Sequence, residues 1–263
     1  ATPHENALRI EVTAQKWFWT FTYPNGYSDG TLHLPVDRPV EFVLTSRDMI
    51  HSLYIPAFRI KKDAVPGRYN RMWCTPTKPG TYRIYCTEYC GTEHSSMVSK
   101  VVVHEPGGYE QWLEEASRSV FGELTDEQYE RWVSLESMEE FEAFKADLAE
   151  IDPDLAEKAE DLKPPFLVGE ELSNNKGGCY QCHSIDGSPG KGPTWKNLWM
   201  KRRVFQDGSE AVADENYLRT AILAPGRELV QGYGNLMNSY EGQLTDREIG
   251  AIIAYIRSLK EDE

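Results

Sequence analysis

Two cysteines, a histidine and a methionine lie within a twelve-residue segment, at Cys86, Cys90, His94 and Met97. Thiolate, imidazole and thioether ligands together favour copper, zinc or iron–sulfur over magnesium or calcium. The thioether favours copper, because zinc sites use cysteine, histidine and carboxylate, whereas a weak methionine ligand is typical of copper electron-transfer sites. The spacing therefore predicts a copper site. The alternatives are a disulfide and a zinc clip, and neither needs Met97.

The second cysteine indicates a site with two copper ions. A pair of thiolates, Cys86 and Cys90, can bridge two coppers, and each copper then needs a terminal imidazole. His94 supplies one of them. The other must come from elsewhere in the chain, and the best candidate is His51, in the segment DMIHSL.

The motif CYQCH at residues 179–183 predicts a second metal centre, because it is the attachment sequence of a c-type haem. Two thiols three residues apart, Cys179 and Cys182, can reach the two vinyl groups of a haem. The adjacent His183 then lies under the iron as an axial ligand. The fifth cysteine, Cys74, is predicted to be a small buried hydrophobe.

The elements that must position these residues change character along the chain. Short β-like runs separated by turn signals predict an antiparallel sandwich or barrel, and they occupy residues 8–12, 15–24, 31–34, 40–45, 51–55, 68–73, 80–85 and 97–104. Apolar residues every three to four positions then predict three short amphipathic helices within residues 125–162. Two more helices are expected at 216–223 and 246–259, capped by Asp214 and Thr245.

The charge divides the 263-residue chain in the same way. The net charge is −14, and residues 107–165 carry 18 acidic and 5 basic side chains. This distribution argues against a nucleic-acid partner, which needs a basic face. We predict a first domain at 1–106, an acidic helical linker at 107–165 and a second domain at 166–263. The acidic linker is expected to be a solvated face, with a docking surface for a basic donor as the alternative.

Residues 86–97 resemble the CuA-binding loop of cytochrome c oxidase subunit II, and residues 51–68 resemble the same family's first-ligand segment. The resemblance implies a cupredoxin-like Greek-key sandwich and binuclear copper. It implies six ligands: His51, Cys86, the carbonyl of Glu88, Cys90, His94 and Met97. It also implies that Trp17 receives electrons from cytochrome c, although a sandwich core is the other interpretation of this aromatic stretch.

Residues 166–260 resemble an all-α class I cytochrome c. In that family the second axial methionine lies on the loop before the last helix, which implies Met237 rather than Met200. The family usually has proline after this methionine, whereas Asn238 stands here. The carbonyl of Pro193 is expected to orient His183.

As a whole the chain resembles oxidase subunit II with a fused cytochrome c, the caa(3)-type arrangement. This implies electron flow from a soluble donor such as cytochrome c to haem c, then to CuA, then to subunit I, where oxygen becomes water. The chain itself would carry electrons without an open catalytic site. The alternatives are a subunit of a CuA-type nitric oxide reductase and a stand-alone electron carrier.

The sequence contains no apolar run of about eighteen residues that could span a membrane, and no secretory signal pattern. Proteins of the resembled family usually carry one or two membrane helices before the copper domain. We therefore expect the natural protein to begin upstream of Ala1. We also expect it to act on the periplasmic, outer face of the bacterial cytoplasmic membrane.

Overall fold

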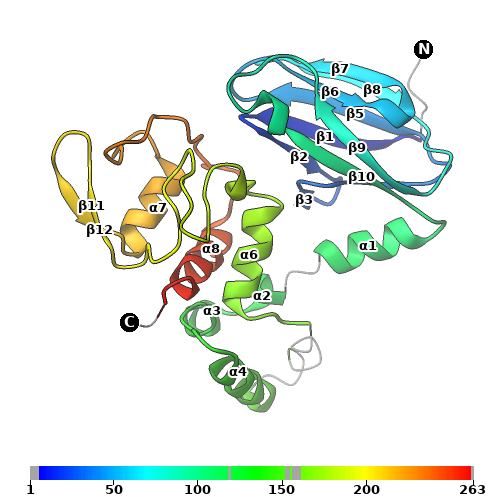
Figure 1. Ribbon diagram of the computed structural model, residues 1–263. Coiled ribbons are helices and arrows are strands. Elements are labelled where there is room, and N and C mark those ends of the chain that lie inside the picture. The colour runs from blue at the N-terminus through cyan, green and yellow to red at the C-terminus, as the bar shows by residue number, and fades with distance from the viewer. Residues whose placement is uncertain (1–5, 118–119, 152–154, 156–160, 262–263) are drawn as a thin grey trace. The chain divides into compact units, whose positions relative to one another are not determined.

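The computed structural model describes residues 6–117, 120–151, 155 and 161–261 (Figure 1). The chain forms two compact units, residues 1–118 and 119–263. The strands of the first unit are β1 (Leu8–Gln15), β2 (Phe18–Thr22), β3 (Ser28–Asp29), β4 (Leu32–Pro35), β5 (Val40–Ser46), β6 (His51–Ile55), β7 (Ile60–Ala64), β8 (Asn70–Cys74), β9 (Gly80–Cys86) and β10 (Val98–His104). Two 3₁₀ turns, η1 (Pro56–Phe58) and η2 (His94–Ser96), and helix α1 (Gly108–Ser117) complete it.

The strands build two five-stranded sheets, in the orders β3-β2-β1-β5-β8 and β4-β10-β9-β6-β7. The predicted sandwich is therefore confirmed, but its strands are not all antiparallel. Strand β1 runs parallel to β5, and β10 runs parallel to β4. Parallel neighbours need crossover connections, which local turn signals cannot reveal.

Side-chain alternation explains the core of the sandwich. Along β1, Leu8, Ile10, Val12 and Ala14 are buried, while the residues between them face outward or are half-buried. Because side chains alternate between the two faces of a strand, these residues all point from one face of the sheet into the core. The fully buried Phe42, Leu44, Leu53 and Ile84 fill the same core from the other strands.

The expected strand over residues 15–24 is interrupted at its start. Strand β1 ends at Gln15 and β2 begins at Phe18, so Lys16 and Trp17 form the turn of a hairpin. Two aromatic residues of β2, Trp19 and Phe21, are buried in the sandwich core, as expected. Trp17 itself belongs to the turn, so its side chain is not bound to the face that the strand alternation predicted.

Helix α1 lies on the sandwich, where Trp112 packs against Tyr23, Tyr27, His33 and His104. The first part of the predicted linker thus belongs to the β unit. This helix was not predicted, because its stabilising contacts come from residues distant in the chain.

The second unit contains α2 (Val120–Glu123), α3 (Asp126–Val133), α4 (Met138–Ile151), α6 (Pro165–Asn174), η3 (Cys179–Gln181), β11 (Arg202–Val204), β12 (Glu210–Val212), α7 (Glu215–Leu223) and α8 (Asp246–Ser258). The predicted caps of α7 and α8 are confirmed: Asp214 accepts from the backbone of Tyr217, and Thr245 forms a capping box with Glu248. Helix α6, which begins at Pro165, was not predicted. The expected third linker helix begins at Asp152, outside the described residues.

The aromatic stripe of the predicted linker packs inside this second unit. The Tyr129 hydroxyl donates to the carbonyl of Arg247 on α8 at 3.0 Å. The indole of Trp132 donates to the carbonyl of Lys163 at 3.0 Å. Within the residues that the structure describes, no helix is both long and apolar enough to cross a membrane.

Candidate metal centres

Two neighbouring strands and one loop bring the predicted copper ligands together. His51 opens β6 and Cys86 closes β9, and these strands pair with Leu53 opposite Cys86. The loop after β9 carries Cys90 and His94 and returns at Met97, whose carbonyl accepts from the backbone of Cys86 at 3.1 Å. Pairing between β9 and β10 therefore closes the loop at its base.

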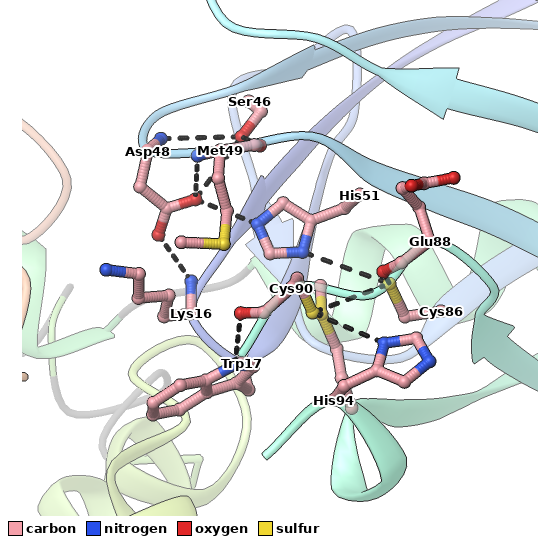
Figure 2. A network of polar contacts seen from close by, with 11 residues as sticks. Lys16, Trp17, Ser46, Asp48, Met49, His51, Cys86, Glu88, Cys90 and His94 are labelled. Carbon is pink, nitrogen blue, oxygen red and sulfur yellow. Dashed lines mark hydrogen bonds and ion pairs between the residues drawn. The ribbon is translucent and has the colours of Figure 1, made fainter. Parts of the chain in front are cut away.

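The two cysteine sulfurs are the centre of this cluster (Figure 2). Their Sγ atoms lie 3.8 Å apart, too far for a disulfide, and both cysteines are free. The Nδ1 atom of His51 lies 3.9 Å from the sulfur of Cys86, and Nδ1 of His94 lies 3.5 Å from that of Cys90. Figure 2 shows the two imidazole rings approaching the sulfur pair from different sides.

The remaining two expected donors also face the sulfurs. The carbonyl oxygen of Glu88 lies 3.3 Å from Sγ of Cys86, and Sδ of Met97 lies 3.9 Å from Sγ of Cys90. His51, Cys90 and Met97 are fully buried. The ligand atoms of His51, Cys86 and Cys90 all lie within 4.8 Å of one another, as a shared metal site requires. The soft donors of this set fit copper.

The pKa values of the two thiols, Cys86 and Cys90, are also consistent with a site that binds a cation. Burial raises the pKa of Cys86, but a hydrogen bond with His51 and further polar contacts outweigh it and lower the pKa to about 7. Burial and the adjacent charge of Cys86 raise the pKa of Cys90 to about 12. The two thiols titrate as a pair. Without a cation, the protein thus favours one thiolate and one thiol near neutral pH. A bound cation would stabilise both cysteines as thiolates.

A carboxylate that the sequence analysis did not identify holds His51 in place. Oδ1 of Asp48 accepts from Nε2 of His51 at 2.8 Å. Burial raises the pKa of Asp48, but this bond and two backbone donors lower it to about 2, so the side chain is ionised. An acidic residue three positions before a candidate ligand was the available signal, because metal-bound histidines usually donate their other N–H to a carboxylate or carbonyl.

Trp17 is buried rather than exposed above the copper site, with 2% of its surface accessible. Its indole Nε1 donates to the carbonyl of Cys90 at 2.8 Å. A Cβ atom on Gly91 would lie 3.2 Å from its ring, so the ligand loop rests directly on the indole. The predicted role of Trp17 in receiving electrons stays a prediction.

The haem motif is held by its own set of contacts. Nδ1 of His183 donates to the carbonyl of Pro193 at 2.7 Å, which leaves Nε2 for an iron ion. A Cβ on Gly192 would lie 2.6 Å from the imidazole, so only glycine permits this approach. The indole of Trp195 stacks on the imidazole with ring centroids 5.3 Å apart. Burial lowers the pKa of His183, which keeps it neutral.

The wall beside Pro193 suits an anionic group. A cavity of about 280 Å³ lies there, and its lining includes three basic side chains, Lys201, Arg202 and Arg203, beside neutral residues. Nε of Arg203 is buried and has no hydrogen-bond partner in the described part of the chain. A haem propionate would satisfy such a donor, so this side of the site fits the group.

The two candidate methionines differ in their surroundings. Met237 is half-buried on the loop between α7 and α8. Met200 is 55% exposed and its φ is 62°, in the left-handed region. The partial burial favours Met237 as a ligand, and this assignment stays a prediction. Cys74 is half-buried with a pKa raised to about 12 by burial, so it behaves as an un-ionised thiol.

Comparison with known proteins identifies both units. Residues 26–105 match the family model of the cytochrome c oxidase subunit II periplasmic domain, and residues 168–260 match that of cytochrome c. One segment of the chain thus matches a subunit II periplasmic domain, and a later segment matches cytochrome c. The resemblance that the motifs carried is thereby confirmed, and so is the two-domain fold class.

Two curated relatives are both named cytochrome c oxidase subunit 2. Cytochrome c oxidase subunit 2 of Alkalihalophilus pseudofirmus is 30% identical over 97% of this chain and 62% of the relative. That of Thermostichus vulcanus is 38% identical over 53% of this chain and 44% of the relative. The chain therefore spans less than two thirds of either relative. A solved periplasmic domain of oxidase subunit II from Bradyrhizobium japonicum is 29% identical, with 44% of this chain and 98% of that chain covered and a TM-score of 0.42.

Proposed function

We propose that this chain is the electron-carrying subunit of a haem–copper terminal oxidase of the caa(3) type. An external donor delivers electrons to the cytochrome c domain. The subunit II domain receives them and passes them to subunit I, which reduces oxygen to water. When bound, haem c and the binuclear copper supply reversible one-electron exchange.

The observation that carries this proposal is the completeness of the donor set around the two cysteine sulfurs. Each expected donor lies within 3.9 Å of a cysteine sulfur, and the centre of the set is buried. A closed donor set leaves no position for a substrate, which suits electron transfer and not catalysis at the copper. The side chains that would hold the two coppers are His51, Cys86, Cys90, His94 and Met97, together with the carbonyl of Glu88.

The cytochrome c domain supports the same proposal. Cys179 and Cys182 would tether the haem, and His183 and Met237 would be its axial ligands. Histidine and methionine ligation raises a haem potential, which suits delivery to a copper acceptor. The carbonyl of Pro193 and the ring of Trp195 orient the imidazole.

The name of the matched family, a periplasmic domain, supports a position on the outer face of the bacterial cytoplasmic membrane. Its relatives are named as oxidase subunits, which supports assembly with subunit I and other oxidase subunits. A soluble cytochrome c or a similar carrier is the proposed donor.

Electron paramagnetic resonance of the copper-loaded protein tests the proposal. One unpaired electron shared by two coppers gives a seven-line hyperfine pattern, and metal analysis should find two copper ions for each iron. A four-line pattern, or one copper for each iron, would remove the oxidase assignment.

A further inference from the structure

The turn between β1 and β2 reaches both segments that carry copper ligands. On one side, the backbone N–H of Lys16 donates to Oδ2 of Asp48 at 2.7 Å. On the other side, the indole N–H of Trp17 donates to the carbonyl of Cys90 at 2.8 Å. Two adjacent residues thus bind the histidine segment and the cysteine loop, which are separated in sequence (Figure 2).

Asp48 is the point where this turn meets a ligand. Its two carboxylate oxygens divide their partners: Oδ2 accepts from Lys16, while Oδ1 accepts from Nε2 of His51 at 2.8 Å and from the backbone of Met49 at 2.7 Å. Only 13% of its side-chain surface is accessible, and that of His51 is fully buried. Water therefore has little access to replace these bonds.

The bond to Asp48 decides which nitrogen of His51 faces the sulfurs. A carboxylate oxygen accepts, so Nε2 of His51 carries a proton and points towards Asp48, away from the sulfurs. Nδ1 is the atom that lies 3.9 Å from Sγ of Cys86. Without the carboxylate, the ring could take either tautomer.

Trp17 fixes the other half of the site. Its indole holds the Cys90 carbonyl, and the neighbouring Gly91 has a φ of +111°, in the left-handed region where glycine is favoured. The loop backbone lies against the ring at this position. Motion of the cysteine loop away from His51 would have to break the indole bond.

We propose that Asp48 and the Lys16–Trp17 turn form a clamp that arranges the copper ligands before copper arrives. Asp48 and Trp17 are positioning residues, since they act through His51 and Cys90. The turn couples the two ligand segments, so that loss of either bond loosens the site. This inference rests on the proposed copper function for its purpose, and measurements on the copper-free protein test the clamp separately from that function.

The decisive experiment compares Asp48→Ala with Asp63→Ala in the full chain. Asp63 is a matched control, because its Oδ1 accepts from the hydroxyl of Ser52, the residue next to His51, at 2.7 Å. Copper affinity is measured by competition with a chelator, and the His51 tautomer is measured by ¹⁵N NMR of the copper-free protein. Asp48→Ala should weaken copper binding by about 10–100-fold and mix the tautomers. Asp63→Ala should change the affinity by less than about threefold.

Two conservative variants keep the test independent of folding. Asp48→Asn keeps one oxygen that can accept from Nε2 of His51, but its NH2 group then faces the backbone N–H of Lys16, so it should recover only part of the affinity. Trp17→Phe removes the indole N–H and keeps an aromatic ring. Backbone amides of residues 87–91 should then exchange with solvent about tenfold faster in the copper-free protein, while His51 keeps its tautomer.

Two outcomes would overturn the clamp. One is that Asp48→Ala binds copper as tightly as Asp63→Ala and keeps a single His51 tautomer. The other is that Trp17→Phe leaves amide exchange in the cysteine loop unchanged. Failure of the wild-type protein to bind two coppers, with a tautomer that still depends on Asp48, would overturn the oxidase proposal and leave the clamp standing.

Discussion

Trp112 of α1 stacks on His33 of β4 with ring centroids 3.8 Å apart and the rings nearly parallel, at 2°. Nδ1 of His33 lies 2.8 Å from Nε2 of His104, so one imidazole donates to the other. Tyr23 and Tyr109 pack against the same indole. This group of aromatic rings attaches α1, where the chain leaves the copper domain, to the β-sandwich.

The attachment of α1 should weaken in acid. Burial and the nearby His104 lower the pKa of His33 to about 3, and burial lowers that of His104, although Glu110 opposes it. Both pKa values lie below the unfolded value of about 6.5. The stabilisation is therefore present above about pH 6.5 and is lost as the pH falls towards 3.

Hydrogen exchange of residues 108–117, corrected for intrinsic rates, measures this effect. Between pH 7 and pH 5 the free energy of local opening should fall by about 1 kcal/mol, allowing for solvent screening. His33→Gln removes the group with the larger shift, so its pH dependence should be less than half that of the wild type. Equal pH dependence in the two proteins would contradict the role of His33.

Gly169→Ala should destabilise the cytochrome c domain severely. Helices α6 and α8 approach so closely that a Cβ at Gly169 would lie 2.0 Å from the carbonyl oxygen of Ala251 and 2.8 Å from Cβ of Tyr255. Because backbone must move, we expect a loss of about 3 kcal/mol. Thermal unfolding followed by haem absorbance measures it. As a control, a Cβ at Gly234 meets only Leu236, at 3.8 Å, so Gly234→Ala should cost far less.

Met237→Ala should abolish the weak absorption near the red edge of the spectrum that is typical of low-spin haem with histidine and methionine ligands. The copper spectrum should not change, because the copper ligands belong to the other domain. Met200→Ala is the control and should retain the band. The reverse pattern would make Met200 the ligand.

Arg203→Met should lower the reduction potential of the haem. A positive charge beside the haem favours the reduced iron, which carries one charge less. Removal of that charge should lower the potential by roughly 20–60 mV. Redox titration followed by haem absorbance measures the shift. Arg202→Met is a suitable control, since Arg202 is exposed and paired with Glu210. Equal shifts in both variants would argue against a specific contact of Arg203.

Local patterns were sufficient for a large part of the fold. Strand β6 begins at His51 and ends at Ile55, as predicted. The cap at Thr245 was also predicted, and the capping box that it forms with Glu248 joins residues three positions apart. Helices α1 and α6 were missed, since their stability comes from burial against distant elements and not from their own periodicity.

By itself, the sequence determined which metals this protein can hold, because the choice depends on donor chemistry and on spacing within two short motifs. Only the tertiary structure decided which residues orient those donors. The Lys16–Trp17 turn of the β1–β2 hairpin lies far from both Asp48 and Cys90 in sequence, and it contacts both. Hydrogen bonds between distant segments depend on which strands pair, and a local sequence pattern does not predict that pairing.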